Sequence, residues 1–419
     1  MVLFNRSRYV STTSTRSTST SKLLMGQGMS PTSSHHVLKI QFDAPLPVRV
    51  LNKSEVRRGM EKGSVCVLIP SVGNANELKV VLEGLKKQDH EGAIEVVVVG
   101  PGNDPGREVA EQNGARFIDD EGVRTRADAC NIGIKQTESE FVFFTDDDVI
   151  VPSNWVSSLI RWFDRSDVAG VGGPNFAPLK ESTFWQRVID VTFCSRWVTA
   201  GTNYGNQAKD DLEEVEQLPG VNAAYRRSVL EEVGGFDKGA IGCEDAMLDH
   251  RIRSAGHRLW QDGTAIMWHR RRGPGRVRKQ IGNYGLVRIL ASHIHPEMRA
   301  WSHFLVGIFP ILSLLGILGL CYGAAMGGAA WELWLRIDGP WSIERVAFHG
   351  SLGLMGLYVA ICWAGALFGN SPSRSVLTVA AAPLMTFLMH WSYGRGVLQG
   401  WIRIRSGRPG LQIDDRIRS

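Results

Sequence analysis

The stretch FVFFTDDD, residues 141–148, places three adjacent carboxylates directly after a run of residues suited to a buried strand. The end of a strand is where a sheet can present charges to a ligand without burying them. Asp146, Asp147 and Asp148 would repel one another unless a cation lay among them. A hard divalent metal that holds a phosphorylated ligand meets this requirement, and a solvated acidic turn is the alternative.

Around this stretch the chain alternates apolar runs with helical patterns. VCVLI (65–69) and EVVVV (95–99) are short apolar runs that end in turn residues, as buried parallel strands do. Residues 78–85, 126–136 and 156–163 repeat apolar side chains at helical spacing. This order predicts a mainly parallel sheet with right-handed crossovers. Ligands bind such sheets at the carboxyl ends of the strands, which is where the aspartates lie.

Charge and cysteine usage narrow the class of protein. The 419 residues carry a net charge of +5, with basic clusters before Asp43, at 269–279 and at 403–418. Such clusters bind nucleic acid or anionic lipid, and the apolar segments beside them favour a membrane and no nucleic acid. The six cysteines include no CxxC pair, which argues against a zinc or redox motif and favours reduced, buried thiols in a cytosolic domain.

Three uncharged segments follow, at 304–328, 346–369 and 375–391. The first two are long enough to cross a bilayer. The third is shorter and contains Pro383 and His390, so a re-entrant or interfacial segment is the alternative. Because the positive-inside rule keeps the Arg-rich tail on the cytosolic side, we expect an even number of crossings.

The sequence therefore predicts four parts. Residues 1–36 form a Ser/Thr-rich basic arm that cannot bury enough apolar surface to fold. Residues 60–295 form the α/β domain, 303–393 a transmembrane region of two or three segments, and 394–419 a basic tail.

A second acidic site lies about a hundred residues after the first. Glu244 and Asp245 open a predicted helix, and a carboxylate at a helix N-terminus stays ionised and can act as a base. Taken alone, such a pair is more often an ordinary acidic first turn. Further on, His269 could complete a metal site with the aspartates, although a lone histidine is more often structural. The arginines at 270–272 could neutralise a diphosphate or meet lipid headgroups.

In order and spacing, these motifs resemble the family 2 glycosyltransferases, inverting enzymes of the GT-A fold. The resemblance covers about residues 64–290, and the membrane-bound branch that makes exopolysaccharides looks closest. Members of that branch also carry segments like QIGNYG (280–285) and HWSYGRG (390–396). The matching segments are VLIPS (67–71), RADACNIG (126–133), DDD (146–148), GGFD (234–237), Glu244-Asp245 with Leu248 and Arg251, and His269.

The resemblance implies a Rossmann-like, mainly parallel α/β catalytic domain followed by transmembrane helices, and it implies a role for each matching residue. Asp245 would be the general base that deprotonates the acceptor. Asp146, Asp148 and His269 would hold Mn²⁺ or Mg²⁺. The remaining expected site residues are Pro70, Ser71, Arg126, Asn131, Asp146 and Asp147 for the nucleotide donor, and Asn222, Arg226 and Glu244 for the donor-sugar and acceptor pocket.

The implied activity is inverting transfer of a sugar from a UDP- or GDP-sugar to a lipid-linked glycan or polysaccharide, on the cytoplasmic side of the inner or plasma membrane. Two departures qualify this expectation. Gly100 stands where the family usually has a base-reading Asp, so Asn103 or Asp104 would have to substitute, and the Arg-Trp pair of the processive QxxRW motif is missing after Gln280. The alternatives are a metal-dependent nucleotidyl- or phosphotransferase and an inactive scaffold that binds nucleotide-sugar.

Overall fold

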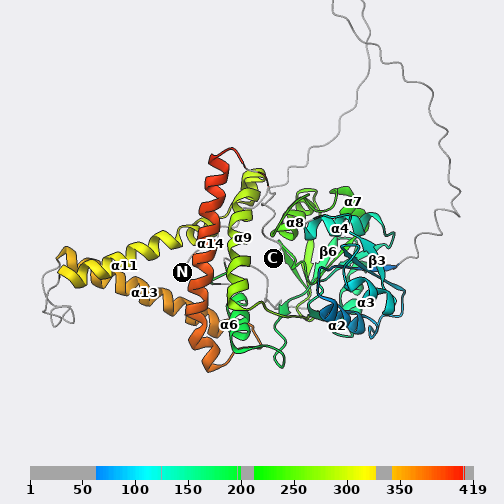
Figure 1. The fold of residues 1–419 in the computed structure, drawn as a ribbon, viewed down its shortest axis with the longest axis horizontal. Helices are drawn as coiled ribbons and strands as arrows, with labels where there is room; N and C mark the ends of the chain where they lie inside the picture. Colours follow the sequence, from blue (N-terminus) through cyan, green and yellow to red (C-terminus); the bar gives the residue numbers. More distant parts are fainter. Residues whose placement is uncertain are drawn as a thin grey trace, which may run out of the picture. The chain divides into compact units, whose positions relative to one another are not determined.

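Parallel strands form the centre of the α/β domain in the computed structural model (Figure 1). The structure describes residues 63–123, 125–195, 197–199, 212–326, 342–408 and 410, so the predicted arm at 1–36 and the end of the tail lie outside the described residues. The larger sheet has the order β3 (Arg116–Asp119), β2 (Ile94–Gly100), β1 (Val65–Pro70), β4 (Phe141–Phe144), β9 (Ala223–Arg226), β6 (Gly170–Gly172), β10 (Leu259–Gln261) and β8 (Glu213–Val215).

The pairing of these strands confirms the predicted fold class. β1 pairs in parallel with β2 and β4, β2 with β3, and β6 with β10, whereas β9 and β8 run antiparallel to their neighbours. The carboxyl ends of β1, β2 and β4 therefore meet at one edge, and the three aspartates follow β4 there.

Alternate residues of the strands supply two cores. Val67 and Ile69 of β1 face a core shared with α2 (Ala75–Leu85) and α5 (Trp155–Ile160), which is followed by η1 (Arg161–Asp164). Cys66 and Leu68 face a core shared with α4 (Arg126–Lys135), α7 (Arg227–Glu232) and α8 (Glu244–Ser254). Each face of the sheet is thus covered by helices, with α3 (Gly106–Gln112) beside α2, because strand side chains alternate between the two faces.

A small second sheet joins distant parts of the chain beside the aspartates. It has the order β5 (Val149–Ile150), β11 (Met267–His269) and β7 (Asn175–Phe176). In its register His269 pairs with Val149, the residue directly after Asp148. Sheet pairing therefore brings His269 close to Asp148, which is 121 positions earlier in the sequence (269 − 148).

Two long helices pack along each other next to the α/β domain (Figure 1). They are α9 (Pro274–Ile294) and α14 (Val376–Arg405), and α6 (Phe184–Phe193) joins them in one apolar cluster. Glycines permit the close approach, because a Cβ at Gly285 would collide with the backbone of Tyr393 and a Cβ at Gly396 with that of Gly282. The segments QIGNYG and HWSYGRG therefore pack against each other.

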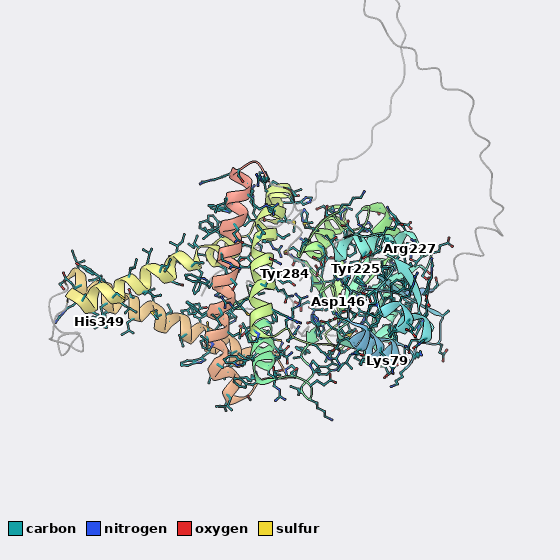
Figure 2. All side chains as sticks on the ribbon, in the orientation of Figure 1. Lys79, Asp146, Tyr225, Arg227, Tyr284 and His349 are labelled. Carbon is teal, nitrogen blue, oxygen red and sulfur yellow. The ribbon has the colours of Figure 1, made fainter. Side chains whose placement is uncertain are left out.

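The remaining helices form the apolar region. The connection η2 (Pro296–Met298) leads to α10 (Trp301–Gly307) and α11 (Phe309–Met326), and α13 (Ile343–Phe368) pairs with α11 as a hairpin. Figure 2 shows this hairpin carrying His349 away from the α/β domain that contains Tyr225 and Arg227.

Within the described residues, two helices are long and apolar enough to cross a membrane, α13 and α14, and a third span is available if α10 and α11 are one bent span. The bend between α10 and α11 is 44°. The first predicted span is therefore broken near Ile308. The predicted third segment, 375–391, is the first half of one helix, α14, which continues to Arg405 past the expected start of the basic tail at residue 394.

One buried ion pair connects the helical region to the domain. Arg271 donates to Asp190 of α6 at 2.9 Å and to the Asn175 side chain of β7 at 2.7 Å. Ser371, in the connection between α13 and α14, donates to the other Asp190 oxygen at 2.6 Å. The Arg271 and Asp190 side chains are 2% and 0% exposed. Removing one partner would therefore leave a buried, unpaired charge.

Asp190→Ala should destabilise the protein by about 3–5 kcal/mol, because it leaves the Arg271 guanidinium buried without a counter-charge. Thermal unfolding of the detergent-purified chain measures this effect. The control is Asp167→Ala, which breaks the exposed pair of Asp167 with Arg165 and should change the midpoint little. Equal midpoints for the two variants would contradict the assigned role of Asp190.

Candidate functional site

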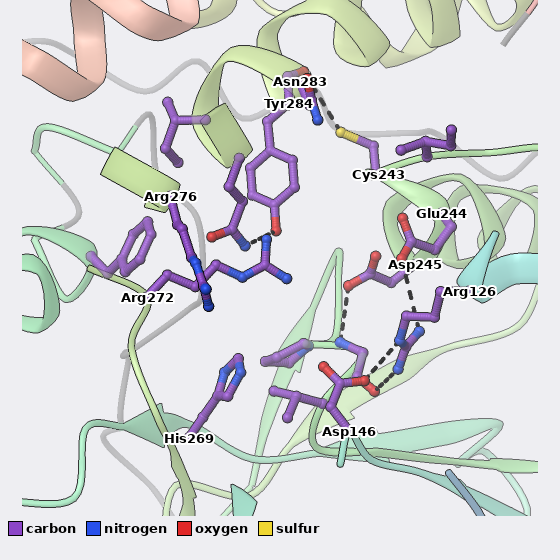
Figure 3. Close-up of a pocket in the computed structure, with 18 of the residues that line it drawn as sticks. Arg126, Asp146, Cys243, Glu244, Asp245, His269, Arg272, Arg276, Asn283 and Tyr284 are labelled. Carbon is purple, nitrogen blue, oxygen red and sulfur yellow. Dashed lines mark hydrogen bonds and ion pairs between the residues drawn. The ribbon is translucent and has the colours of Figure 1, made fainter. Parts of the chain in front are cut away.

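A pocket of about 1080 Å³ lies where the strand ends meet α9. One wall consists of the ends of β1 and β4, with Pro70, Ser71 and the three aspartates. The opposite wall comes from the segment that runs from His269 into α9, and the start of α8 closes a third side. Figure 3 shows Asp146 and His269 facing Arg272 and Arg276 across this space, with Asp245 and Glu244 at its side.

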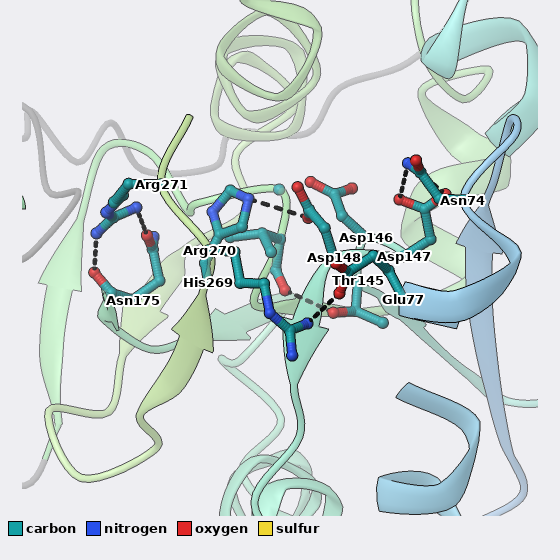
Figure 4. Close-up of polar contacts among 12 residues, drawn as sticks. Asn74, Glu77, Thr145, Asp146, Asp147, Asp148, Asn175, His269, Arg270 and Arg271 are labelled. Carbon is teal, nitrogen blue, oxygen red and sulfur yellow. Dashed lines mark hydrogen bonds and ion pairs between the residues drawn. The ribbon is translucent and has the colours of Figure 1, made fainter. Parts of the chain in front are cut away.

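Asp146, Asp148 and His269 form a three-ligand group. Their ligand atoms lie within 4.8 Å of one another, and the His269 Nε2 lies 3.2 Å from the Asp148 Oδ1 (Figure 4). The pKa of Asp148 is lowered, because the charges of His269 and Arg272 outweigh the effect of burial, which would raise it. Apart from its ion pair with His269, that buried Asp148 oxygen has no hydrogen-bond partner among the described residues. An ionised carboxylate oxygen beside a second carboxylate and an imidazole fits a divalent cation.

Asp147, between the two aspartates, faces the other way. It accepts hydrogen bonds from the Ser71 hydroxyl at 2.6 Å and from the Asn74 amide at 3.2 Å (Figure 4). Burial raises the pKa of Asp147 to about 6, although these hydrogen bonds oppose the shift. Asp147 and Ser71 therefore bind each other at the wall of the pocket and fix the end of β1 against the end of β4.

The three arginines after His269 point in different directions. Arg270 pairs with Glu77 of α2 at 2.6 Å and with Glu181 at 2.7 Å, and Arg271 is committed to Asp190 and Asn175. Arg272 lines the pocket together with Arg276 of α9, and neither makes an ion pair within the described part of the chain. Of the predicted Arg cluster, only Arg272 is therefore free to meet a diphosphate.

Arg126 connects the two acidic sites. Its Nε donates to Asp146 at 2.8 Å and its Nη2 donates to the Gly220 carbonyl at 2.8 Å, while Nη1 lies 3.9 Å from Glu244 (Figure 3). The amide of Gly220 in turn donates to the Asp245 Oδ2 at 2.9 Å. One cation and one peptide unit thus set the position of Asp245 relative to the metal group.

Glu244 and Asp245 differ in their surroundings. Glu244 is buried, and burial together with the neighbouring Asp245 charge raises its pKa to about 7. Asp245 is half-buried and points into the pocket (Figure 3). The turn before them is fixed by Cys243, which holds a left-handed φ of 60° at the N-cap of α8, an uncommon conformation for a residue with a side chain.

Two residues expected in the donor-sugar and acceptor pocket lie elsewhere. The Asn222 side chain is fully buried and satisfied, since it accepts from the Trp155 indole at 2.8 Å and donates to the carbonyls of Pro174 and Ala265. Arg226 pairs with Phe141 at the opposite end of β4 and donates to the carbonyls of Val168, Phe163 and Arg165. Neither side chain lines the pocket as expected. Arg226 lies far from the aspartates because β9 runs antiparallel to β4. Asn222 lies at the aspartate end of β4, but its side chain is directed into the core and bonded to Trp155.

Asn131, expected at the donor, is also structural. Its amide makes two hydrogen bonds with the Phe236 backbone, at 2.9 and 2.8 Å. A Cβ at Gly235, whose φ is 74°, would collide with Asn131. RADACNIG and GGFD are thus close in space because Asn131 fixes the glycine turn that precedes α8.

Sequence reasoning missed several pocket residues. Asp120 follows the edge strand β3 and lines the pocket, whereas Asp104 is occupied by the amides of Gly73 and Gly106. Acidic residues directly after a predicted strand could have indicated Asp120. At Gly100 a Cβ would collide with the Ser71 carbonyl, so this backbone does not accommodate an Asp there. Three further pocket residues lie in segments noted in the sequence but were given no role there: Arg276, Tyr284 and Tyr393. The others had no sequence signal: Cys243, Arg288 and His303.

Comparisons with known proteins agree on a family. Residues 66–234 match the model of glycosyl transferase family 2. Among curated relatives, the chain is 26% identical to a probable glycosyltransferase, YdaM, of Bacillus subtilis over 34% of this chain and 33% of that one. It is 25% identical to glycosyltransferase AglE of Haloferax volcanii over 54% and 73%. With the poly-beta-1,6-N-acetyl-D-glucosamine synthase of Staphylococcus aureus it shares 23% over 42% of each chain.

Among solved structures, a mannosyltransferase from Pyrobaculum calidifontis in complex with GDP-Man and Mn²⁺ aligns with a TM-score of 0.47 and 17% identity, over 80% of this chain and 86% of that one. The chain spans about a third of the Bacillus relative and less than half of the synthase. The residues matched by the family model contain Asp146, Asp148, Arg126 and the strands from β1 to β9, whereas His269 and Asp245 lie outside the match. Over these residues the chain is similar to glycosyl transferase family 2.

Proposed function

We propose that the protein is a membrane-bound, inverting glycosyltransferase that moves a sugar from a nucleoside diphosphate donor to a hydroxyl of a lipid-linked glycan or polysaccharide. The observation that carries this proposal is the meeting of two acidic sites in one pocket. Asp146, Asp148 and His269 form one site, Asp245 belongs to the other, and Arg126 joins them.

The donor diphosphate belongs beside the metal group. Mn²⁺ or Mg²⁺ held by Asp146, Asp148 and His269 would stabilise the negative charge that develops on the leaving diphosphate. Arg272 and Arg276, which line the facing wall without ion pairs among the described residues, add positive charge for the same group. Pro70, Ser71 and Asp120 line the side on which the nucleoside would lie.

Asp245 fits the role of general base. It accepts the proton of the acceptor hydroxyl, whose oxygen then forms a bond to C1 of the donor sugar. The C1–O bond to the diphosphate breaks as this bond forms, and the diphosphate leaves with the electron pair. A single in-line displacement of this kind inverts the anomeric centre.

Glu244 is less suited to that role. Its raised pKa keeps part of the population protonated near neutral pH, and the side chain is buried next to Arg126. Glu244 is the buried first residue of α8, and Asp245 beside it is the more accessible member of the pair.

We further propose that the α11–α13 hairpin crosses the membrane twice. Phe309 at the start of α11 contacts α14 through Phe387 and His390, and the end of α13 packs against α6 through Ala366. Both ends of the hairpin therefore attach beside the α/β domain. Along its flanks the exposed side chains are apolar, among them Leu312, Leu315, Leu318, Leu354 and Leu357.

The position of α14 supports an even number of crossings. Met385, Met389 and Gly400 contact α6 or α9 along its length, so α14 stays beside the α/β domain. Its last turns carry Arg403 and Arg405. This arrangement keeps the basic end of the helix on the same side as the α/β domain, as the positive-inside rule requires for a cytoplasmic domain.

Asp148→Asn should abolish metal-dependent release of nucleoside diphosphate, because it removes one charged ligand of the metal. The assay uses the detergent-purified chain with Mn²⁺ or Mg²⁺ and a panel of UDP- and GDP-sugars. Asp119→Asn, at the end of β3 but outside the pocket, is the control and should release at the wild-type rate. If no donor gives metal-dependent release and none binds in calorimetry, the proposed donor chemistry is wrong.

Asp245→Asn should lower transfer at least about 100-fold by removing the base, while the Kd for the donor changes less than about twofold. Glu244→Gln is the matched variant at the adjacent position and should retain more activity. Transfer to the acceptor and donor binding are measured separately. Near-normal turnover of Asp245→Asn, with loss in Glu244→Gln, would move the base to Glu244.

Glu244 should also make stability depend on pH. Because its folded pKa of about 7 exceeds the ordinary value of 4.5, the native state binds this proton more tightly than the unfolded state. Stability therefore falls as pH rises from 4.5 towards 7. Glu244→Gln should unfold at a higher temperature than wild type at pH 8, and the difference should shrink at pH 4.5. A difference that does not vary with pH would contradict this account.

A further inference from the structure

The pocket continues past Asp245 into a region that the proposed chemistry does not use. We call it the distal region and define it by Cys243 at the start of α8, Arg288 of α9, His303 of α10 and Tyr393 of α14. Four elements that are far apart in sequence meet there. Its side chains are a cation, an imidazole, a phenol and a thiol.

Arg288 is a cation without a counter-charge. It makes no ion pair with any carboxylate of the described residues. Its guanidinium lies beside the Cys243 thiol, and burial raises the pKa of that thiol, which therefore stays neutral. Asp245 acts on Arg288 electrostatically but does not contact it. Arg288 is half-buried, and an anion stabilises a cation that is partly removed from water, so this arrangement favours an anionic ligand.

Two neighbouring polar atoms also lack partners. The Tyr393 hydroxyl and the His303 Nδ1 are buried and have no hydrogen-bond partner among the described residues. Both side chains lie close enough to Arg288 to interact with it electrostatically. Since most buried polar atoms are hydrogen-bonded, each such atom calls for an explanation. A phosphate group would accept from the phenol, from the imidazole and, in bidentate fashion, from the guanidinium.

The surroundings of the distal region are apolar on the side of the helices. Val306 and Met389 line the same pocket. On α10, which carries His303, Trp301 and Leu305 are 83% and 61% exposed. An anionic head group therefore has a place at Arg288, and an apolar chain attached to it has a place along α10 and α14. A cation next to apolar side chains favours an amphiphilic ligand over a soluble anion.

We propose that the distal region binds the phosphate group of a lipid-linked acceptor, with Arg288 as its principal cation and Tyr393 and His303 as hydrogen-bond donors. The proposal rests on the proposed function, because the same acceptor molecule would present its hydroxyl to Asp245. It adds that the acceptor is recognised through its phosphate as well as through its sugar. It also identifies Arg288 as an acceptor-binding residue, separate from the donor side at Asp148.

The test is a binding experiment without nucleotide-sugar and without metal. The detergent-purified full chain in EDTA is titrated calorimetrically with farnesyl diphosphate, farnesol and inorganic pyrophosphate. EDTA prevents the probes from binding through a metal at Asp146, Asp148 and His269. Arg278, exposed on the same helix and outside the pocket, provides the matched control.

Farnesyl diphosphate should bind the wild type, and Arg288→Gln should weaken it at least about tenfold, as loss of a charged hydrogen-bond partner does. Arg278→Gln should leave the affinity unchanged, and farnesol should bind weakly to all three proteins. Equal affinity of wild type and Arg288→Gln for farnesyl diphosphate would overturn the proposal. Pyrophosphate binding as tight as that of farnesyl diphosphate, and equally lost in Arg288→Gln, would overturn the lipid part of it.

Tyr393→Phe keeps the test decisive if Arg288→Gln fails to fold. This change removes only a hydroxyl that has no partner in the described structure, so the unfolding temperature should stay at the wild-type value. Affinity for farnesyl diphosphate should still fall about threefold to tenfold. Because the assay measures no catalysis, a negative result here would leave metal-dependent release of nucleoside diphosphate intact, and loss of that release would leave this binding intact.

Discussion

The buried pair of Arg271 and Asp190 is the constraint on which the arrangement of this protein depends. Asp190 receives hydrogen bonds from Arg271, from the Ala177 amide and from Ser371. Arg271 follows β11, Ala177 follows β7, and Ser371 lies in the connection between α13 and α14. Because a fully buried carboxylate requires its hydrogen-bond donors, these contacts fix the position of the apolar helices relative to the small sheet. Since Arg271 is two residues after His269, the same contacts also help to position His269 beside Asp146 and Asp148.

Inside the pocket, Arg126 fixes the positions of several acidic side chains. It neutralises Asp146, approaches Glu244 and holds the Gly220 carbonyl, whose own amide is bonded to Asp245. Three carboxylates around one guanidinium would otherwise repel one another. Arg126 thus holds two acidic sites, about a hundred residues apart in the sequence, within one pocket. The distal region also contains an arginine, Arg288. Unlike Arg126, Arg288 contacts no carboxylate among the described residues.

The helices that follow the α/β domain contribute to the site as well as to its attachment. α9 brings Arg276 and Arg288 to the pocket, α10 brings His303 and α14 brings Tyr393. Glycines at 282, 285 and 396 let α9 and α14 approach so closely that residues of both helices reach the same space. In this arrangement the helices with apolar exposed faces also form one wall of the pocket. Such a wall would suit a protein that receives its acceptor from a membrane.

The sequence by itself determined the parallel sheet, the helices on both of its faces, the three aspartates after β4 and the acidic start of α8. These features are local: apolar runs end where the carboxylates begin, and helical spacing buries residues such as Leu78 and Leu248. Only the tertiary structure decided the outcome for residues whose direction depends on a partner strand or helix. Arg226 lies far from the pocket because β9 runs antiparallel to β4, and the Asn222 side chain is turned into the core by its hydrogen bond with Trp155. Asn131 serves a glycine turn 105 residues away, and Arg288 and Tyr393 meet only because α9 packs against α14. No sequence spacing encodes such contacts, since they arise from the packing of segments that are far apart in the sequence.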